Sequence, residues 1–103
     1  MIYRWQVVPG LEAQFEAGWR RGTAVIAREF GGWGSRLHAA GNGVYIAYAQ
    51  WPDEATWKRA AEQGMRHSDE EARAMYRQAI VPGTFETLYA MPVAADLLEL
   101  RRA

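Results

Sequence analysis

The chain has 103 residues, half of them hydrophobic, with 12 basic and 12 acidic side chains and no cysteine. That length suits a single domain, residues 1–103, and so much apolar surface excludes a disordered chain. The lack of cysteine excludes a disulfide scaffold, a thiol nucleophile and a cysteine-bound zinc ion. Because the formal net charge is zero, we expect no nucleic-acid partner. No apolar run approaches the roughly 20 residues of a membrane span, and the N-terminus lacks signal-peptide features, so we expect a cytoplasmic protein without a membrane partner.

The start of the chain predicts a strand followed by an amphipathic helix. Residues 2–8 are mostly β-branched or aromatic and end at Pro9-Gly10, which is typical of a strand. One face of this strand carries Tyr3, Trp5 and Val7. From residue 11 to about residue 30 the apolar side chains recur with a helical period, and Gly31 ends the helix. Its apolar stripe comprises Leu11, Phe15, Trp19, Val25, Ile26 and Phe30.

The middle of the chain predicts a hairpin. Residues 33–40 and 44–51 both alternate as half-buried strands do, and Asn42-Gly43 separates them. Tight hairpin turns prefer this pair because both residues tolerate positive φ. Pro52 then ends the second strand.

The remaining chain predicts two helical segments, a fourth strand and a tail. Asp53 can cap a short helix that ends near residue 63. Ser68, with Glu71 three residues later, forms a capping box that starts another helix. Residues 84–91 alternate again and predict a strand, and residues 93–103 form a C-terminal tail. The buried stripe of the later helix comprises Ala72, Met75, Tyr76, Ala79 and Ile80, and the tail carries Leu97, Leu98 and Leu100.

The order strand, helix, strand, strand, helix, strand predicts an α+β fold of the ferredoxin-like, split βαβ type. This fold is a four-stranded antiparallel sheet with its helices on one face. If Tyr3, Trp5 and Val7 face the helices, the other face of the sheet is too apolar to be left in water. We therefore expect a sheet-to-sheet homodimer.

These elements resemble the antibiotic biosynthesis monooxygenase (ABM) family over about residues 2–92. The family resemblance implies a dimeric α+β barrel in which each chain holds a pocket between its helices and its own sheet. The segments that carry it are Val8-Pro9-Gly10, Arg28-Glu29-Phe30, Gly32-Trp33, Tyr48-Ala49-Gln50-Trp51 and, in the following helix, Trp57.

The resemblance implies a cofactor-independent monooxygenase that oxidises an electron-rich aromatic or quinol substrate with O₂. The substrate would bind as its anion, pass an electron to O₂ and recombine with the resulting radical to give a quinone and water. Two alternatives stay open at this point. One is a non-catalytic dimer that binds small aromatic ligands, and the other is a haem-binding or haem-degrading protein.

The haem alternative depends on Trp57 and on His67, which follows it by ten residues. In the haem-degrading branch of the family a histidine at this spacing is the iron ligand. Here Gly64 and Ser68 place His67 in a break between helices, whereas the family histidine lies on continuous helix. Tyr3 also stands where that branch has an asparagine. Both departures argue against haem turnover.

Aromatic side chains are the candidate substrate-binding residues. Gly18 and Gly22 lie near the centre of the apolar stripe of the first helix, where each costs roughly 1 kcal/mol relative to alanine. They indicate either a hollow of at least about 300 Å³ for a flat ligand or close packing of helix on sheet. The walls of such a hollow would be Tyr3, Trp5, Phe15, Trp19, Ile26 and Trp57, with Trp33 and Trp51 at strand ends or the dimer seam.

The candidate catalytic residues are His38 as base, Tyr76 as a hydrogen-bonding group and Arg77 as a partner for an oxyanion. Each also has a plain structural interpretation, as a satisfied histidine, a core tyrosine or a solvated charge. Glu29 is either part of a frayed last helical turn or a buried base with a raised pKa. The spacing of histidines and carboxylates predicts no metal site, and the family resemblance implies that no cofactor is needed.

Overall fold

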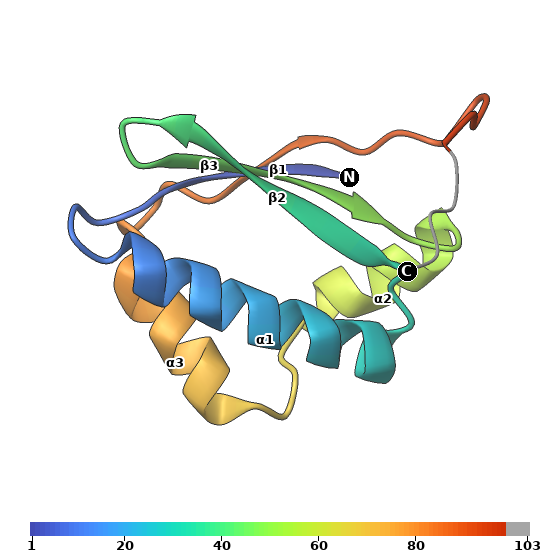
Figure 1. The fold of residues 1–103 in the computed structure, drawn as a ribbon. Coiled ribbons are helices and arrows are strands. Elements are labelled where there is room, and N and C mark those ends of the chain that lie inside the picture. The colour runs from blue at the N-terminus through green and yellow to red at the C-terminus, as the bar shows by residue number, and fades with distance from the viewer. Residues whose placement is uncertain (99–103) are drawn as a thin grey trace.

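The computed structural model describes residues 1–98 and consists of one antiparallel sheet with helices packed on one face (Figure 1). The strands lie in the order β2-β3-β1-β4, which confirms the ferredoxin-like α+β fold. In chain order the elements are β1 (Ile2–Gln6), α1 (Glu12–Phe30), β2 (Gly34–Gly41), β3 (Val44–Gln50), α2 (Glu54–Glu62), α3 (Glu70–Ala79) and β4 (Glu86–Tyr89).

The face of β1 that was predicted to meet the helices does so. Tyr3, Trp5 and Val7 are 7%, 4% and 0% exposed, and they form the core with the buried side chains of β3. The hairpin between β2 and β3 turns at Asn42 and Gly43, whose φ angles are 55° and 75°. These positive values are what a two-residue hairpin turn requires, so the predicted turn is confirmed.

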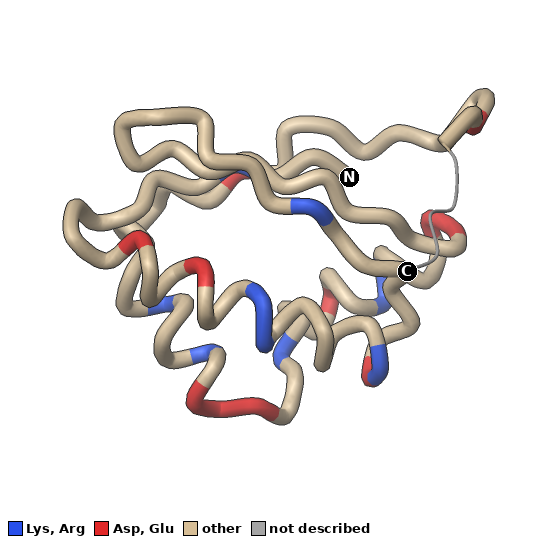
Figure 2. Tube along the Cα trace, in the orientation of Figure 1, with Lys and Arg blue, Asp and Glu red and all other residues tan. Residues whose placement is uncertain are grey.

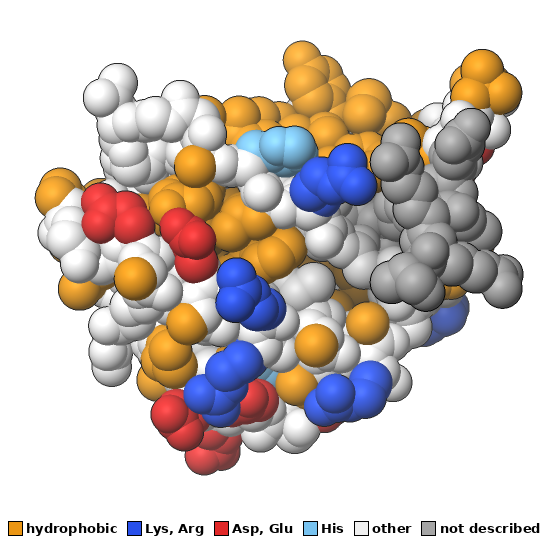
Figure 3. Space-filling model, in the orientation of Figure 1, with side chains coloured by type: hydrophobic (Ala, Val, Ile, Leu, Met, Phe, Trp, Pro, Cys, Tyr) orange, Lys and Arg blue, Asp and Glu red, His pale blue; other side chains and the backbone are white. Residues whose placement is uncertain are grey.

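The helices all lie on one side of the sheet (Figure 1), and hydrophobic side chains gather along the opposite side, at the top of Figure 3. Most charged residues lie along the helices (Figure 2). The charged residues within strands are Arg4, Arg36 and Glu86, and Arg4 forms a 3.6 Å ion pair with Glu86. The register places these three on the uncovered face, together with the apolar side chains of Ile2, Val44, Ile46, Tyr48 and Tyr89.

The predicted capping box at Ser68 is wrong, because a neighbouring residue caps α3. The carboxylate of Asp69 accepts a hydrogen bond from the backbone N–H of Ala72 at 3.0 Å. Ser68 lies outside the helix, and its N–H and hydroxyl both donate to the carboxylate of Glu29. Glu29 is helical and exposed. It is therefore neither frayed nor a buried base, and it ties the end of α1 to the start of α3.

The fourth strand is shorter than predicted. The sequence pattern indicates residues 84–91, but only Glu86–Tyr89 are strand. Thr84 contributes side-chain hydrogen bonds instead: its Oγ1 accepts from the backbone N–H of Gln6 at 3.2 Å. Residues 93–98 are exposed, and the rest of the predicted tail, residues 99–103 with Leu100, lies outside the described residues.

Candidate functional site

A cavity of about 880 Å³ lies between the helices and the sheet. Its walls come from all three helices, from the strands and from the segment of residues 63–67 between α2 and α3. The volume is within the range of pockets that hold small organic ligands, roughly 300 to 1,000 Å³. The prediction of a ligand-sized hollow over Tyr3 and Trp5 therefore agrees with the structure.

The two glycines of α1 line the cavity, in agreement with the predicted hollow, and they also have a packing role that was not predicted. A Cβ atom at Gly18 would lie 2.8 Å from the backbone nitrogen of Tyr76 and 3.1 Å from the carbonyl oxygen of Ala72. A Cβ atom at Gly22 would lie 2.9 Å from Nε2 of His67. The glycines thus allow α3 and the segment before it to contact α1, rather than allowing α1 to approach the sheet.

Tryptophan dominates the walls of the cavity. Trp5, Trp19 and Trp57 line it as predicted, and Trp51 lines it as well, although the sequence pattern placed Trp51 at a strand end or a dimer seam. Trp33 is 68% exposed and does not line it. Indole rings give large flat apolar surfaces, which suit an aromatic ligand.

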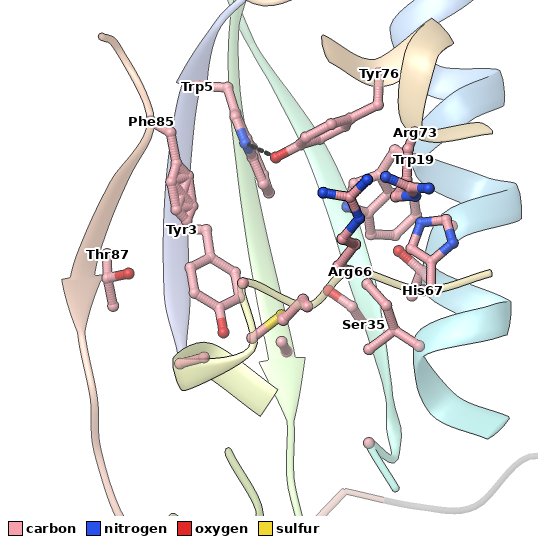
Figure 4. A pocket seen from close by; sticks show the side chains of 18 of the residues that line it. Tyr3, Trp5, Trp19, Ser35, Arg66, His67, Arg73, Tyr76, Phe85 and Thr87 are labelled. Carbon is pink, nitrogen blue, oxygen red and sulfur yellow. Dashed lines mark hydrogen bonds between the residues drawn. The ribbon is translucent and has the colours of Figure 1, made fainter. Parts of the chain in front are cut away.

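Two tryptophan–tyrosine pairs set the polar chemistry of the cavity, and Figure 4 shows one of them, Trp5 with Tyr76. The indole Nε1 of Trp57 donates to the hydroxyl of Tyr3 at 2.8 Å, and Nε1 of Trp5 donates to the hydroxyl of Tyr76. No group among the described residues accepts from either hydroxyl. Each phenol oxygen is therefore held as an acceptor while its own hydrogen remains available for a ligand.

Burial keeps both phenols protonated. It raises the pKa of Tyr3, although the N–H of Trp57 partly opposes the shift. It also raises the pKa of Tyr76, where the N–H of Trp5 is the opposing contact. At neutral pH the cavity thus presents two O–H donors, which suits an oxygen that carries negative charge.

The charged side chains that line the cavity are all basic. The lining contains three arginines, the exposed Arg66 and Arg77 and the partly buried Arg73, and it contains no Asp or Glu. His67 lines the cavity too, but burial and the nearby charge of Arg73 lower its pKa. The cavity therefore favours an anionic ligand.

His67 is held by the protein on both sides of its ring. Its Nδ1 accepts a hydrogen bond from the backbone N–H of Asp69 at 3.2 Å, so the neutral imidazole carries its hydrogen on Nε2. That Nε2 faces the backbone of Gly22. Packed in this way, His67 is not oriented as a base toward the cavity or as a ligand for haem iron.

Two predicted site residues do not reach the cavity. His38 is exposed on β2, opposite Ile46, and points away from the helices, because its neighbour Leu37 is the residue that faces them. Phe15 is fully buried in the core, with ring centroids 5.6 Å from Trp5 and 4.9 Å from Tyr45. Tyr3, Trp5, Trp19, Trp57, Tyr76 and Arg77 do line the cavity.

Sequence reasoning missed Arg66, Arg73 and Trp51. A signal was available for Arg73, which precedes Tyr76 by three residues and Arg77 by four and so shares their side of the helix. Arg66 lies in an irregular segment next to Met65, which has a φ of 48°. No periodicity marks such a position, so its direction could not be read from the sequence.

Residues 1–98 include no group of three or more His, Asp or Glu side chains that could hold a metal ion. None of the helices in this part of the chain is both long and apolar enough to cross a membrane.

Comparison with known proteins yields a structural match but no sequence match. No family model matches the chain, and no curated protein matches it. The solved structure of a mutant form of SnoaB, a cofactor-independent oxygenase from Streptomyces nogalater, aligns with a TM-score of 0.59 and 23% identity. The alignment covers 89% of this chain and 94% of SnoaB. The chain therefore has the fold that its resemblance to the ABM family implies, shared here with the oxygenase SnoaB.

Proposed function

We propose that this chain is a cofactor-independent monooxygenase that oxidises an electron-rich aromatic or quinol substrate with O₂. The observation that carries the proposal is the pair of free tyrosine O–H donors inside a tryptophan-lined cavity whose charged groups are all cationic. The fold shared with a cofactor-independent oxygenase supports it.

The reaction needs no group beyond substrate, O₂ and protein. The substrate loses a proton to water and binds as its anion, which transfers one electron to O₂. The resulting radical and superoxide combine into a carbon-bound peroxide, which takes up a proton. The same carbon then loses its remaining hydrogen as a proton, and the O–O bond breaks to release hydroxide. The carbon is left as the quinone carbonyl, and the proton and hydroxide make one molecule of water. One oxygen atom of O₂ therefore ends in the product and the other in water.

The protein's contribution to this reaction is electrostatic and positional. Tyr3 and Tyr76 donate hydrogen bonds to the oxygen of the substrate anion, and the guanidinium groups favour its ionised form. Trp19 and Trp57 hold the flat ring and exclude water from the radical pair. Neither histidine is needed as a base, since the cationic cavity lowers the pKa of the substrate itself.

The test is oxygen consumption by the purified, metal-free protein with a panel of anthrones and dihydroxynaphthalenes. We expect consumption of one O₂ per quinone formed, and with ¹⁸O₂ one labelled atom in the quinone from an anthrone. The Trp33→Phe protein is the matched control, because Trp33 is exposed outside the cavity. Saturable quenching of tryptophan fluorescence without any O₂ consumption would identify a ligand-binding protein and reject the monooxygenase.

The uncovered face of the sheet supports a homodimer as part of the same proposal. Ile46 lies at its centre, opposite Arg4 of β1 and His38 of β2. We expect light scattering to give twice the 11.7 kDa mass of one chain. An Ile46→Glu substitution is expected to give monomers, while Ala24→Glu on the exposed side of α1 leaves the dimer intact. A monomeric unsubstituted protein would contradict the dimer.

A further inference from the structure

Arg73 carries a positive charge that the protein does not neutralise. Its Nε is buried and has no hydrogen-bond partner among the described residues. Its Nη2 lies 3.8 Å from the carboxylate of Glu70, but the Glu70 side chain is 87% exposed whereas that of Arg73 is 15% exposed. An ion pair that long with a solvated carboxylate contributes little. A buried charge without a partner is unfavourable, so this guanidinium lacks an anion.

A second unneutralised guanidinium belongs to the same region. Figure 4 shows Arg66 and Arg73 extending toward the part of the cavity lined by Trp19 and His67. Neither the lining nor any ion pair within residues 1–98 supplies a carboxylate to Arg66. Two cationic side chains, from the segment before α3 and from α3 itself, thus face one apolar cavity that contains no acidic group.

Tyr3 and the two arginines are separate features of the cavity. In Figure 4 Tyr3 of β1 lies across the view from Arg66 and Arg73, whereas Tyr76 belongs to the same helix as Arg73. A ligand that filled the space from Tyr3 to the arginines would need two polar ends, one at the Tyr3 hydroxyl and one at the guanidinium groups. The indoles in between would hold an aromatic body.

We infer that Arg66 and Arg73 bind a carboxylate of the substrate, at a distance from the oxygen that reacts. Arg66 and Arg73 both line the cavity, and a guanidinium group offers several N–H donors to the two oxygens of a carboxylate. This inference rests on the proposed function for the identity of the cavity as the substrate site. It deepens that function by naming the substrate class, an aromatic carboxylic acid that also carries a phenolic or quinol oxygen.

The test compares two probes that differ only in the carboxylate, 5-hydroxy-1-naphthoate, whose carboxylate and hydroxyl are on different rings, and 1-naphthol, by anaerobic quenching of tryptophan fluorescence. Hydrogen bonds to charged groups contribute about 1.5–3 kcal/mol, so we expect the naphthoate to bind at least about tenfold more tightly than 1-naphthol. In Arg73→Gln and Arg66→Gln the preference is expected to fall severalfold, because the affinity for the naphthoate falls much more than the affinity for 1-naphthol. The preference should also weaken with added NaCl.

Two controls distinguish the loss of a cavity arginine from a general loss of charge and from misfolding. Arg28→Gln removes an exposed arginine outside the cavity and is expected to keep the full preference. Saturable binding of 1-naphthol by the Arg66 variant establishes that its cavity is intact, even if the Arg73 variant fails to fold. Equal affinity of the unsubstituted protein for the two probes, or a full preference in Arg66→Gln and Arg73→Gln, would overturn the inference. So would tighter binding of 1-naphthyl phosphate than of the naphthoate.

Binding and turnover distinguish the inference from the proposed function. A carboxylate preference without O₂ consumption by any quinol or anthrone, carboxylated or not, would leave the arginine site standing and reject the monooxygenase. O₂ consumption with no carboxylate preference would support the monooxygenase and reject the arginine site.

Discussion

Replacing Tyr76 by Phe is expected to lower kcat for O₂-dependent oxidation by about 10²-fold, the usual consequence of removing one hydrogen-bond donor from a developing anion. The Tyr76 hydroxyl accepts from Trp5 and so has its hydrogen free for the substrate oxygen. Because the substrate binds as its anion, the same donor also acts in the bound state, so KM is expected to rise as well. Initial rates of O₂ consumption at saturating and limiting substrate measure the two constants.

The substitution also leaves the Nε1 of Trp5 without its acceptor, so stability has to be measured beside activity. Tyr3→Phe, which removes the second donor, is also expected to lower kcat. Tyr89→Phe is the control, since Tyr89 is 61% exposed and does not line the cavity. If both cavity variants kept full kcat while folded, the phenols would have no part in catalysis.

Replacing Gly18 by Ala is expected to destabilise the protein by about 1–3 kcal/mol, the usual cost of overpacking a closed contact. The new Cβ would lie 2.8 Å from the backbone nitrogen of Tyr76, and backbone cannot rotate away as a side chain can. Helix propensity alone predicts the opposite sign, a gain of about 1 kcal/mol. Urea unfolding followed by tryptophan fluorescence measures the change through the midpoint, with the m-value unchanged.

Gly22 gives a matched comparison on the same helix. A Cβ at Gly22 would meet a side-chain ring, that of His67, rather than backbone. The Gly22→Ala protein is therefore expected to lose less stability than the Gly18→Ala protein. A Gly18→Ala protein that is more stable than the original would show that α1 and α3 are not in backbone contact.

Regular alternation made the fold predictable from the sequence. The face of β1 that carries Tyr3 and Trp5 could be assigned because successive strand residues point to opposite sides. The turn at Asn42-Gly43 could be assigned because it requires positive φ at both positions. These local rules, applied to each element, were enough to give the order of strands and helices.

The candidate site was only partly predictable from the sequence. The direction of a side chain in an irregular segment cannot be read from periodicity, and alternation alone does not say which face of a strand a residue is on. His38 could lie on either face of β2 until the register was known, and it lies on the uncovered one. Arg66 follows Met65, whose positive φ interrupts any regular periodicity from which its direction could be read. Ser68 and Asp69 both had the chemistry of a helix cap, and only the fold decides between them.

The contact between α1 and α3 at Gly18 has a consequence for the range of ligands that the cavity can accept. Where two helices touch through backbone atoms, substitutions of side chains cannot move them apart in small steps. The segment of residues 63–67 on another side of the cavity is short and irregular and presents side chains such as Met65 and Arg66. The cavity thus has one wall whose position is fixed by the backbone and another that single substitutions can reshape. Specificity can therefore be altered in the segment between α2 and α3 without disturbing the packing of α1 on α3.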